Sequence, residues 1–106
     1  MSKVNDLLIG QYVIVRCRDA GVHAGKLIYL KERTAVLERS RRLWYWDPAD
    51  KKKYLSGVAV AGLADTSLVG AEVPLTVLTE DCEILICTAK AADSIRDYPE
   101  DIRTEE

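Results

Sequence analysis

The chain has 106 residues, of which 48% are hydrophobic and 30% are charged, and its formal net charge is −2. These values are typical of one compact domain, so we expect residues 1–106 to form a single unit whose folded core covers residues 10–98. A protein that binds long nucleic acids regardless of sequence normally has a clear basic excess, so the charge balance excludes this class. A core of this size is modest, which favours association with further copies of the chain.

The start of the chain lacks the basic segment and long apolar core of a secretory signal. No apolar run approaches the roughly 20 residues that span a bilayer. Cys17, Cys82 and Cys87 are odd in number and have no paired short spacing. Disulfide frameworks and zinc ribbons use even, regularly spaced sets, so the pattern favours reduced thiols. We therefore expect a cytoplasmic protein without a metal or other cofactor.

Residues 11–18 predict a strand, because β-branched and aromatic residues dominate the segment. Alternate side chains of a strand share a face, and we assign to the core Val13, Val15 and Cys17. The opposite face then carries Tyr12, Ile14, Arg16 and Arg18. The small residues and glycines that follow predict a loop over residues 19–25, which carries His23.

Two further strands are expected over residues 26–30 and 34–38, joined as a hairpin by the polar turn at 31–33. A basic cluster at residues 39–42 follows, and residues 43–46 predict another strand. Asp47 and Pro48 end it, because proline lacks a backbone donor and restricts the residue before it. Residues 50–53 are expected to be a solvated loop or the start of a helix.

Residues 54–64 are consistent with either a short helix or a buried strand, and we favour the helix. Residues 65–70 predict a loop, and residues 71–78 and 83–87 predict two strands joined by a turn at 79–81. Thr88 is a suitable N-cap for a helix over residues 89–98, followed by a charged tail at 99–106. The expected fold is α+β: a small, twisted, mainly antiparallel sheet with a C-terminal helix and one further short helix.

Residues 41–46, Arg-Arg-Leu-Trp-Tyr-Trp, are the most informative stretch and hold both tryptophans of the chain. In a strand, Arg42, Trp44 and Trp46 would share one face, and Arg41 would lie on the other. Aromatic rings stack on bases, and guanidinium groups suit phosphate, so the run predicts a pocket for an anionic ligand with a flat ring. The alternative is that the tryptophans anchor a core or a subunit interface.

Other side chains are weaker candidates for the same site. Arg16 and Arg18 are spaced to hold one pyrophosphate, although an ordinary solvated strand face has the same pattern. His23 could donate to a phosphate or a ribose hydroxyl, or it could be structural. Ser56 could lie near a helix N-terminus, where backbone donors favour anions. No catalytic motif is present, and with His23 as the only histidine a catalytic triad is unsupported, so we expect no enzyme activity.

The sequence resembles the first Thoeris anti-defence family of bacteriophage proteins over residues 10–98. Residues 41–46 are the most specific part of the resemblance. The remaining parts are Tyr12-Val13-Ile14-Val15-Arg16 with residues 20–25, Leu55-Ser56-Gly57-Val58-Ala59, and residues 78–80, 83–85 and 87–88. The 55–59 stretch is less polar than the family pattern leads us to expect, which leaves the role of Ser56 and the choice of ligand open.

The resemblance implies a sponge that sequesters an immune signal in the infected host cell without cleaving it. It implies a cyclic ADP-ribose isomer as ligand, cyclic trinucleotides as a second ligand, and a homo-oligomer between dimer and hexamer. We would assign Arg16, Arg18, Arg41 and Arg42 to phosphate, Trp44 and Trp46 to the base, and His23 with Ser56 to polar support. The main alternative is a phage factor whose aromatic patch inhibits a host enzyme. A second alternative is a nuclease or phosphodiesterase.

Overall fold

In the computed structural model, residues 7–100 are described, with the backbone alone for residues 81 and 82. This part of the chain contains six strands: β1 (Tyr12–Cys17), β2 (Gly21–Lys31), β3 (Thr34–Tyr45), β4 (Leu68–Val69), β5 (Val73–Leu78) and β6 (Asp81–Ile86). Two helices lie wholly within it, α2 (Leu55–Ala61) and α3 (Ala89–Asp97). All five pairings between these strands are antiparallel. The fold is therefore α+β, as predicted.

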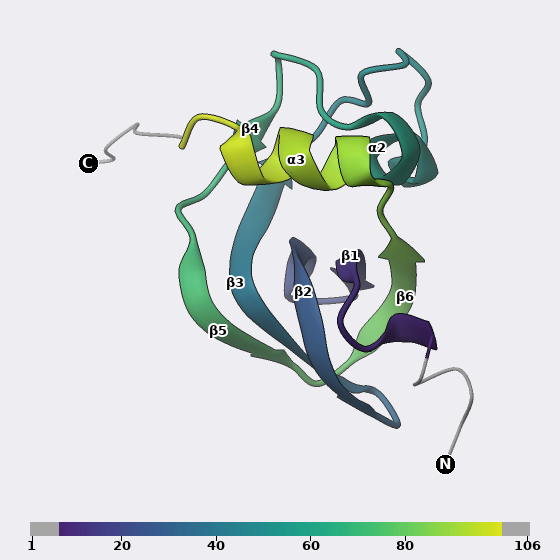
Figure 1. Ribbon diagram of the computed structural model, residues 1–106, viewed down its shortest axis with the longest axis vertical. Helices are drawn as coiled ribbons and strands as arrows, with labels where there is room; N and C mark the ends of the chain where they lie inside the picture. Colours follow the sequence, from purple (N-terminus) through teal and green to yellow (C-terminus); the bar gives the residue numbers. More distant parts are fainter. Residues whose placement is uncertain (1–6, 101–106) are drawn as a thin grey trace.

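The sheet curls on itself. Its hydrogen-bonded order is β4-β3-β2-β1-β6, and β5 also pairs with β3. Thus β5 and β6 lie at opposite ends of the series β5-β3-β2-β1-β6, yet only residues 79 and 80 connect them. Figure 1 shows these two strands running down opposite sides and meeting at the bottom of the view. The curled sheet encloses an inner core formed by Val13, Val15, Cys17, Leu27, Ala35, Leu37 and Leu78.

A second core, the helix-side core, lies between the outer surface of the sheet and the two helices. It consists of Ile14, Ala24, Leu43, Leu55, Val58, Ala59, Leu63, Val69 and Ile95. The helix α3 turns Ala91, Ala92 and Ile95 toward the protein. Thr88 caps it, because its hydroxyl accepts a hydrogen bond from the Ala91 backbone nitrogen at 3.1 Å. The helix predicted within residues 54–64 is confirmed as α2.

The strand β1 is buried on both faces, so assigning one face to the core described only half of its packing. Val13, Ile14 and Val15 are all fully buried. Val13 and Val15 belong to the inner core, whereas Ile14 belongs to the helix-side core. The helices cover the opposite face. The sequence predicts Tyr12, Ile14, Arg16 and Arg18 on that face and does not assign it to the core.

The hairpin β2–β3 is confirmed, but β3 is one strand of 12 residues where two shorter strands were predicted. A bulge explains how it continues through the basic cluster. Arg39 has a positive φ of 54°, and the β2–β3 register shifts between Ala24 and Lys26. The extra residue reverses the alternation of faces. Leu37 therefore faces the inner core while Arg41 and Leu43 face the helices.

The loop predicted over residues 19–25 is wrong after residue 20, because β2 begins at Gly21. His23 lies within this strand, opposite Val15 of β1 and Arg42 of β3. Gly25 adjoins the register shift. A Cβ added at this position would lie 3.0 Å from the Ser40 Cα. The glycine therefore permits the close approach of β2 and β3 and does not end a strand. Residues 101–106 of the predicted tail lie outside the described residues, and Glu100 forms a bridge with Val69.

Candidate functional site

Arg41 is a structural cation that joins α3 to the sheet. Its side chain is 5% exposed. Its Nε donates to the carbonyl oxygen of Gly70 at 2.8 Å, and its Nη1 donates to those of Ile95 at 2.8 Å and Tyr98 at 2.6 Å. A cation is favoured at a helix C-terminus because the last carbonyls there lack partners within the helix. The assignment of Arg41 to phosphate is therefore corrected, since these donors already hold backbone carbonyls.

Arg42 and Trp44 form a stacked pair on the face of β3 opposite Arg41. The guanidinium carbon of Arg42 lies 3.8 Å from the centroid of the Trp44 ring, a cation–π geometry. Two glycines make room for the pair. A Cβ on Gly21 would lie 2.8 Å from Arg42 Nη2, and one on Gly70 would lie 3.2 Å from Trp44 Nε1. Trp44 is nevertheless 59% exposed, so it is not a core anchor.

His23 adjoins this pair, because it lies opposite Arg42 in the β2–β3 register. Its Nε2 donates to the carbonyl oxygen of Ala20 at 2.9 Å. Burial lowers the pKa of His23 below its usual value, and the nearby Arg42 guanidinium lowers it further, while the hydrogen bond to Ala20 acts in the opposite direction. The histidine is thus held neutral at physiological pH and supports the turn that precedes β2.

The other predicted residues lie elsewhere. Arg16 lies opposite Val22 in the β1–β2 register, and its Nε is 3.4 Å from Glu83 Oε1 in an exposed ion pair. Arg18 is exposed in the β1–β2 turn, and Ser56 is exposed on α2. Trp46 follows the end of β3 and packs against the helix-side core, away from the stacked pair. The structure therefore does not bring the eight predicted residues into one cavity.

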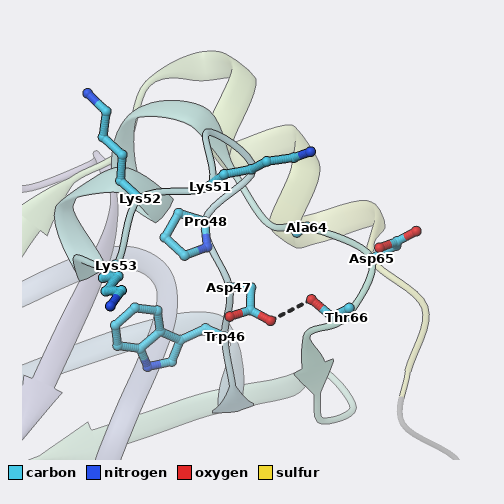
Figure 2. A pocket seen from close by; sticks show the side chains of 9 residues that line it. All are labelled: Trp46, Asp47, Pro48, Lys51, Lys52, Lys53, Ala64, Asp65 and Thr66. Atoms are coloured by element: carbon cyan, nitrogen blue, oxygen red, sulfur yellow. Dashed lines mark hydrogen bonds between the residues drawn. The ribbon is translucent and has the colours of Figure 1, made fainter.

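A pocket of about 570 Å³ lies beside Trp46, and we call it the tryptophan–lysine pocket. Two loops, residues 46–53 and 64–66, form it (Figure 2). Its lining consists of Trp46, Asp47, Pro48, Lys51, Lys52, Lys53, Ala64, Asp65 and Thr66. All three lysines are exposed, and in Figure 2 the ammonium groups of Lys51 and Lys52 point in different directions toward solvent. The pocket thus combines one indole wall with a cationic rim.

Hydrogen bonds fix the two loops to each other. The backbone nitrogen of Ala64 donates to the Asp47 carbonyl oxygen at 2.8 Å, and the Thr66 hydroxyl donates to the Asp47 carboxylate. The Asp47 nitrogen in turn donates to Ser67 Oγ at 2.9 Å. These contacts occupy Asp47, so the other charged side chains on the lining are the three lysines and the exposed Asp65.

The three lysines line this pocket but are not among the predicted site residues, because the sequence predicts a solvated loop or the start of a helix at residues 50–53. The available signal was their position directly after the aromatic run and Pro48. A second hollow, of about 310 Å³, lies beside Cys17 and has Asp19 and Glu80 on its lining, so its charge does not suit an anion.

Burial keeps the Cys87 thiol from being a reactive group. Burial raises the pKa of the Cys87 thiol to about 12, so it is protonated at neutral pH. Within residues 7–80 and 83–100 no three histidine, cysteine or acidic side chains are grouped in a way that could hold a metal ion. The described helices are all too short or too polar to cross a membrane.

The fold and the tryptophan–lysine pocket define a small α+β protein with an open, cationic, partly aromatic pocket. Comparison with protein families identifies the family of this protein. Residues 10–95 match the family described as a domain of unknown function, DUF6948. Because this match covers most of the chain, the protein belongs to that family. No curated protein matches the chain.

Proposed function

We propose that this protein captures a small anionic ligand that carries a planar ring and releases it unchanged. One observation carries the proposal: the Trp46 indole and three lysine residues, Lys51, Lys52 and Lys53, line the same pocket of about 570 Å³. Pockets for small molecules are commonly about 300–1,000 Å³. The indole offers a stacking surface, and the lysines can meet two or more phosphate charges. This combination suits a nucleotide.

The energetics agree with such a role. Stacking of a base on an aromatic ring contributes about 1–3 kcal/mol. Trp46 is held by the helix-side core and Asp47 by the neighbouring loop, so the wall is ordered before the ligand arrives. Preordering preserves affinity, because each flexible side chain that is immobilised costs about 0.5–1.5 kcal/mol. The lysines would bear that cost when they close on the phosphates.

The specific ligand we propose is a cyclic ADP-ribose isomer, which the resemblance to the Thoeris anti-defence family suggests. Such a molecule has a flat base and two phosphates, the two features that Trp46 and the lysine rim can recognise. Sequestration of this messenger in the cytoplasm of an infected cell would protect a phage from the host response. Cyclic trinucleotides are the second ligand to test.

Isothermal titration calorimetry with a panel of ADP-ribose isomers and cyclic oligonucleotides tests the proposal. We expect saturable binding, with intact ligand recovered by chromatography after the complex is heated. Changing Lys51, Lys52 and Lys53 together to glutamine should weaken binding at least about tenfold, and added salt should weaken the wild-type complex. Lys31→Gln is the matched control, because this exposed lysine lies at the end of β2, outside the pocket. No binding of any nucleotide would contradict the proposal, and altered products would indicate an enzyme.

A second candidate function is binding to a host protein through the stacked pair. Trp44 and the adjacent Tyr45 are 59% and 53% exposed, and exposed aromatic residues beside arginine are typical of interface hot spots. Trp44→Ala separates the two candidates. It should leave nucleotide binding intact if the pocket is the site, and it should abolish capture of a host partner if the exposed pair is the site.

A further inference from the structure

One wall of the tryptophan–lysine pocket is a loop that lies against α3. Ala64, Asp65 and Thr66 form this wall, and they belong to the connection between α2 and β4, residues 62–67. In Figure 2 the helix α3 is seen behind this connection. A loop on the protein surface has no core of its own, so its shape depends on the groups to which it is hydrogen-bonded. The contacts between the loop and α3 therefore bear directly on the shape of the pocket.

The loop is anchored near both of its ends by side chains at α3. Near its start, the backbone nitrogen of Leu63 donates to Ser94 Oγ at 3.0 Å. Near its end, the hydroxyl of Tyr98 donates to the carbonyl oxygen of Ser67 at 2.5 Å and also lies 3.2 Å from that of Ala64. A phenol has a single proton to donate, so the shorter contact with Ser67 is the main anchor.

Ser67 connects this anchor to the aromatic wall of the pocket. Its side chain is buried, and its Oγ accepts a hydrogen bond from the Asp47 backbone nitrogen at 2.9 Å. Asp47 directly follows Trp46 in the chain. Tyr98 is not on the lining, yet two successive hydrogen bonds link its hydroxyl to the residue beside the indole. A displaced Ser67 would therefore displace Asp47 and the neighbouring wall.

The backbone of Tyr98 is itself fixed, so its hydroxyl has a defined position. Arg41 Nη1 donates to its carbonyl oxygen at 2.6 Å, and its nitrogen donates to the Ile95 carbonyl oxygen at 3.3 Å. Two residues further on, Glu100 forms a bridge with Val69 of β4. The Tyr98 ring packs against the helix-side core. Such a support favours a preformed pocket, because a loop that must be ordered on binding reduces the affinity.

We propose that Tyr98 is a positioning residue of the tryptophan–lysine pocket, whose hydroxyl holds the 62–67 loop in the conformation that receives the ligand. This role rests on the proposed function, since it concerns the same pocket. It makes the affinity for the ligand depend on the docking of the end of α3 against the sheet. Because coupling between two sites is reciprocal, a bound ligand in turn strengthens the contact between Tyr98 and the loop.

Tyr98→Phe tests the role, because it keeps the ring and removes the hydroxyl. The probe is the nucleotide of the calorimetric panel that binds the wild-type chain most tightly. We expect the affinity to fall about fivefold or more, at a temperature at which circular dichroism shows the variant fully folded. Tyr12→Phe is the matched control. Tyr12 also packs against the helix-side core, but among the described residues its buried hydroxyl has no hydrogen-bond partner, so this variant should bind like the wild type.

Amide hydrogen exchange gives a readout that a general loss of stability would not produce. In unliganded Tyr98→Phe, exchange should become faster at the amides of Asp47 and Ser67, whose hydrogen bonds lie in the loop contacts. It should not change in the turn between β2 and β3, which lies at the other end of the sheet (Figure 1). In the wild-type protein the ligand should slow exchange at the Tyr98 amide, although this residue is outside the lining. That measurement needs no variant, so it decides the matter even if Tyr98→Phe does not fold.

The outcomes separate this role from the proposed function. If no nucleotide binds the wild-type chain, the proposed function fails and the positioning role fails with it. If the wild type binds but Tyr98→Phe binds equally well, only the positioning role is overturned. It is also overturned if Tyr12→Phe weakens binding as much, or if the ligand leaves exchange at the Tyr98 amide unchanged.

Discussion

Arg41 is the residue whose loss should destabilise the fold most clearly, and Arg41→Met isolates its contribution. Methionine can fill much of the space of the arginine stem but donates no hydrogen bond. The substitution removes the side-chain donor from the carbonyl oxygens of Gly70, Ile95 and Tyr98, of which Ile95 keeps the Tyr98 backbone nitrogen at 3.3 Å. It therefore removes the link between α3 and the end of β3.

The expected magnitude follows from these contacts. Hydrogen bonds that involve a charged group contribute about 1.5–3 kcal/mol each, so three of them contribute about 5–9 kcal/mol. Against this gain stands the cost of desolvating a guanidinium, which is several kcal/mol. The contact with the Ile95 carbonyl is buried, whereas the carbonyls of Gly70 and Tyr98 are partly accessible and regain water. We therefore expect the free energy of unfolding to fall by about 3–5 kcal/mol, a large part of the total for a domain of this size.

Urea unfolding followed by circular dichroism measures this loss, and thermal unfolding should show a fall in Tm of about 15 °C. Arg41→Lys should lose about half as much, because one ammonium group cannot reach both Gly70 and α3. Arg42→Met is the matched control. Arg42 is the adjacent arginine, it is half-exposed, and its loss should cost less than about 1 kcal/mol. Equal losses at the two positions would refute the assignment of Arg41 as a structural clamp.

Three further predictions concern a glycine, a histidine and a thiol. Gly62→Ala should cost about 2–3 kcal/mol in urea unfolding and Gly10→Ala about 1 kcal/mol. Both glycines have φ of 92°, but a Cβ would lie 2.7 Å from the Ser94 side chain at Gly62 and in open space at Gly10; equal costs would contradict this. The lowered pKa of His23 means that the unfolded chain binds a proton more readily. Stability should therefore fall as the pH drops below about 6.5, and His23→Gln should remove that part of the slope; an unchanged slope would contradict the burial of His23. Because its pKa is raised to about 12, Cys87 should react with iodoacetamide much more slowly in the native than in the urea-unfolded protein at pH 8, as measured by mass spectrometry; equal rates would show that it is accessible.

Local features of the fold could be predicted because their causes lie close together in the sequence. The turn at residues 31–33 determined the β2–β3 hairpin, and Thr88 marked the start of α3. The α2 helix was the favoured interpretation of an ambiguous apolar stretch. In each case a few neighbouring residues, with their turn, cap or helical preferences, were sufficient.

The site was harder to predict because it depends on contacts between distant segments. Arg41 and Arg42 are adjacent and identical, yet one is buried and the other half-exposed, and the bulge at Arg39 decides which. No local pattern shows that the carbonyl partners of Arg41 belong to the residue after β4, to α3 and to the residue after α3. Likewise, the three lysines at residues 51–53 line a pocket only because the fold brings residues 64–66 beside Trp46.

Tryptophan fluorescence tests the central claim, capture at the tryptophan–lysine pocket, most directly. The chain has two tryptophans, so Trp44→Phe leaves Trp46 as the single indole reporter. Titration of this variant with a cyclic ADP-ribose isomer should give a saturable change in Trp46 emission, with the same dissociation constant as calorimetry on the wild-type protein. Binding seen by calorimetry without any change at Trp46 would move the site elsewhere, and a panel of nucleotides that produces neither signal would contradict the account.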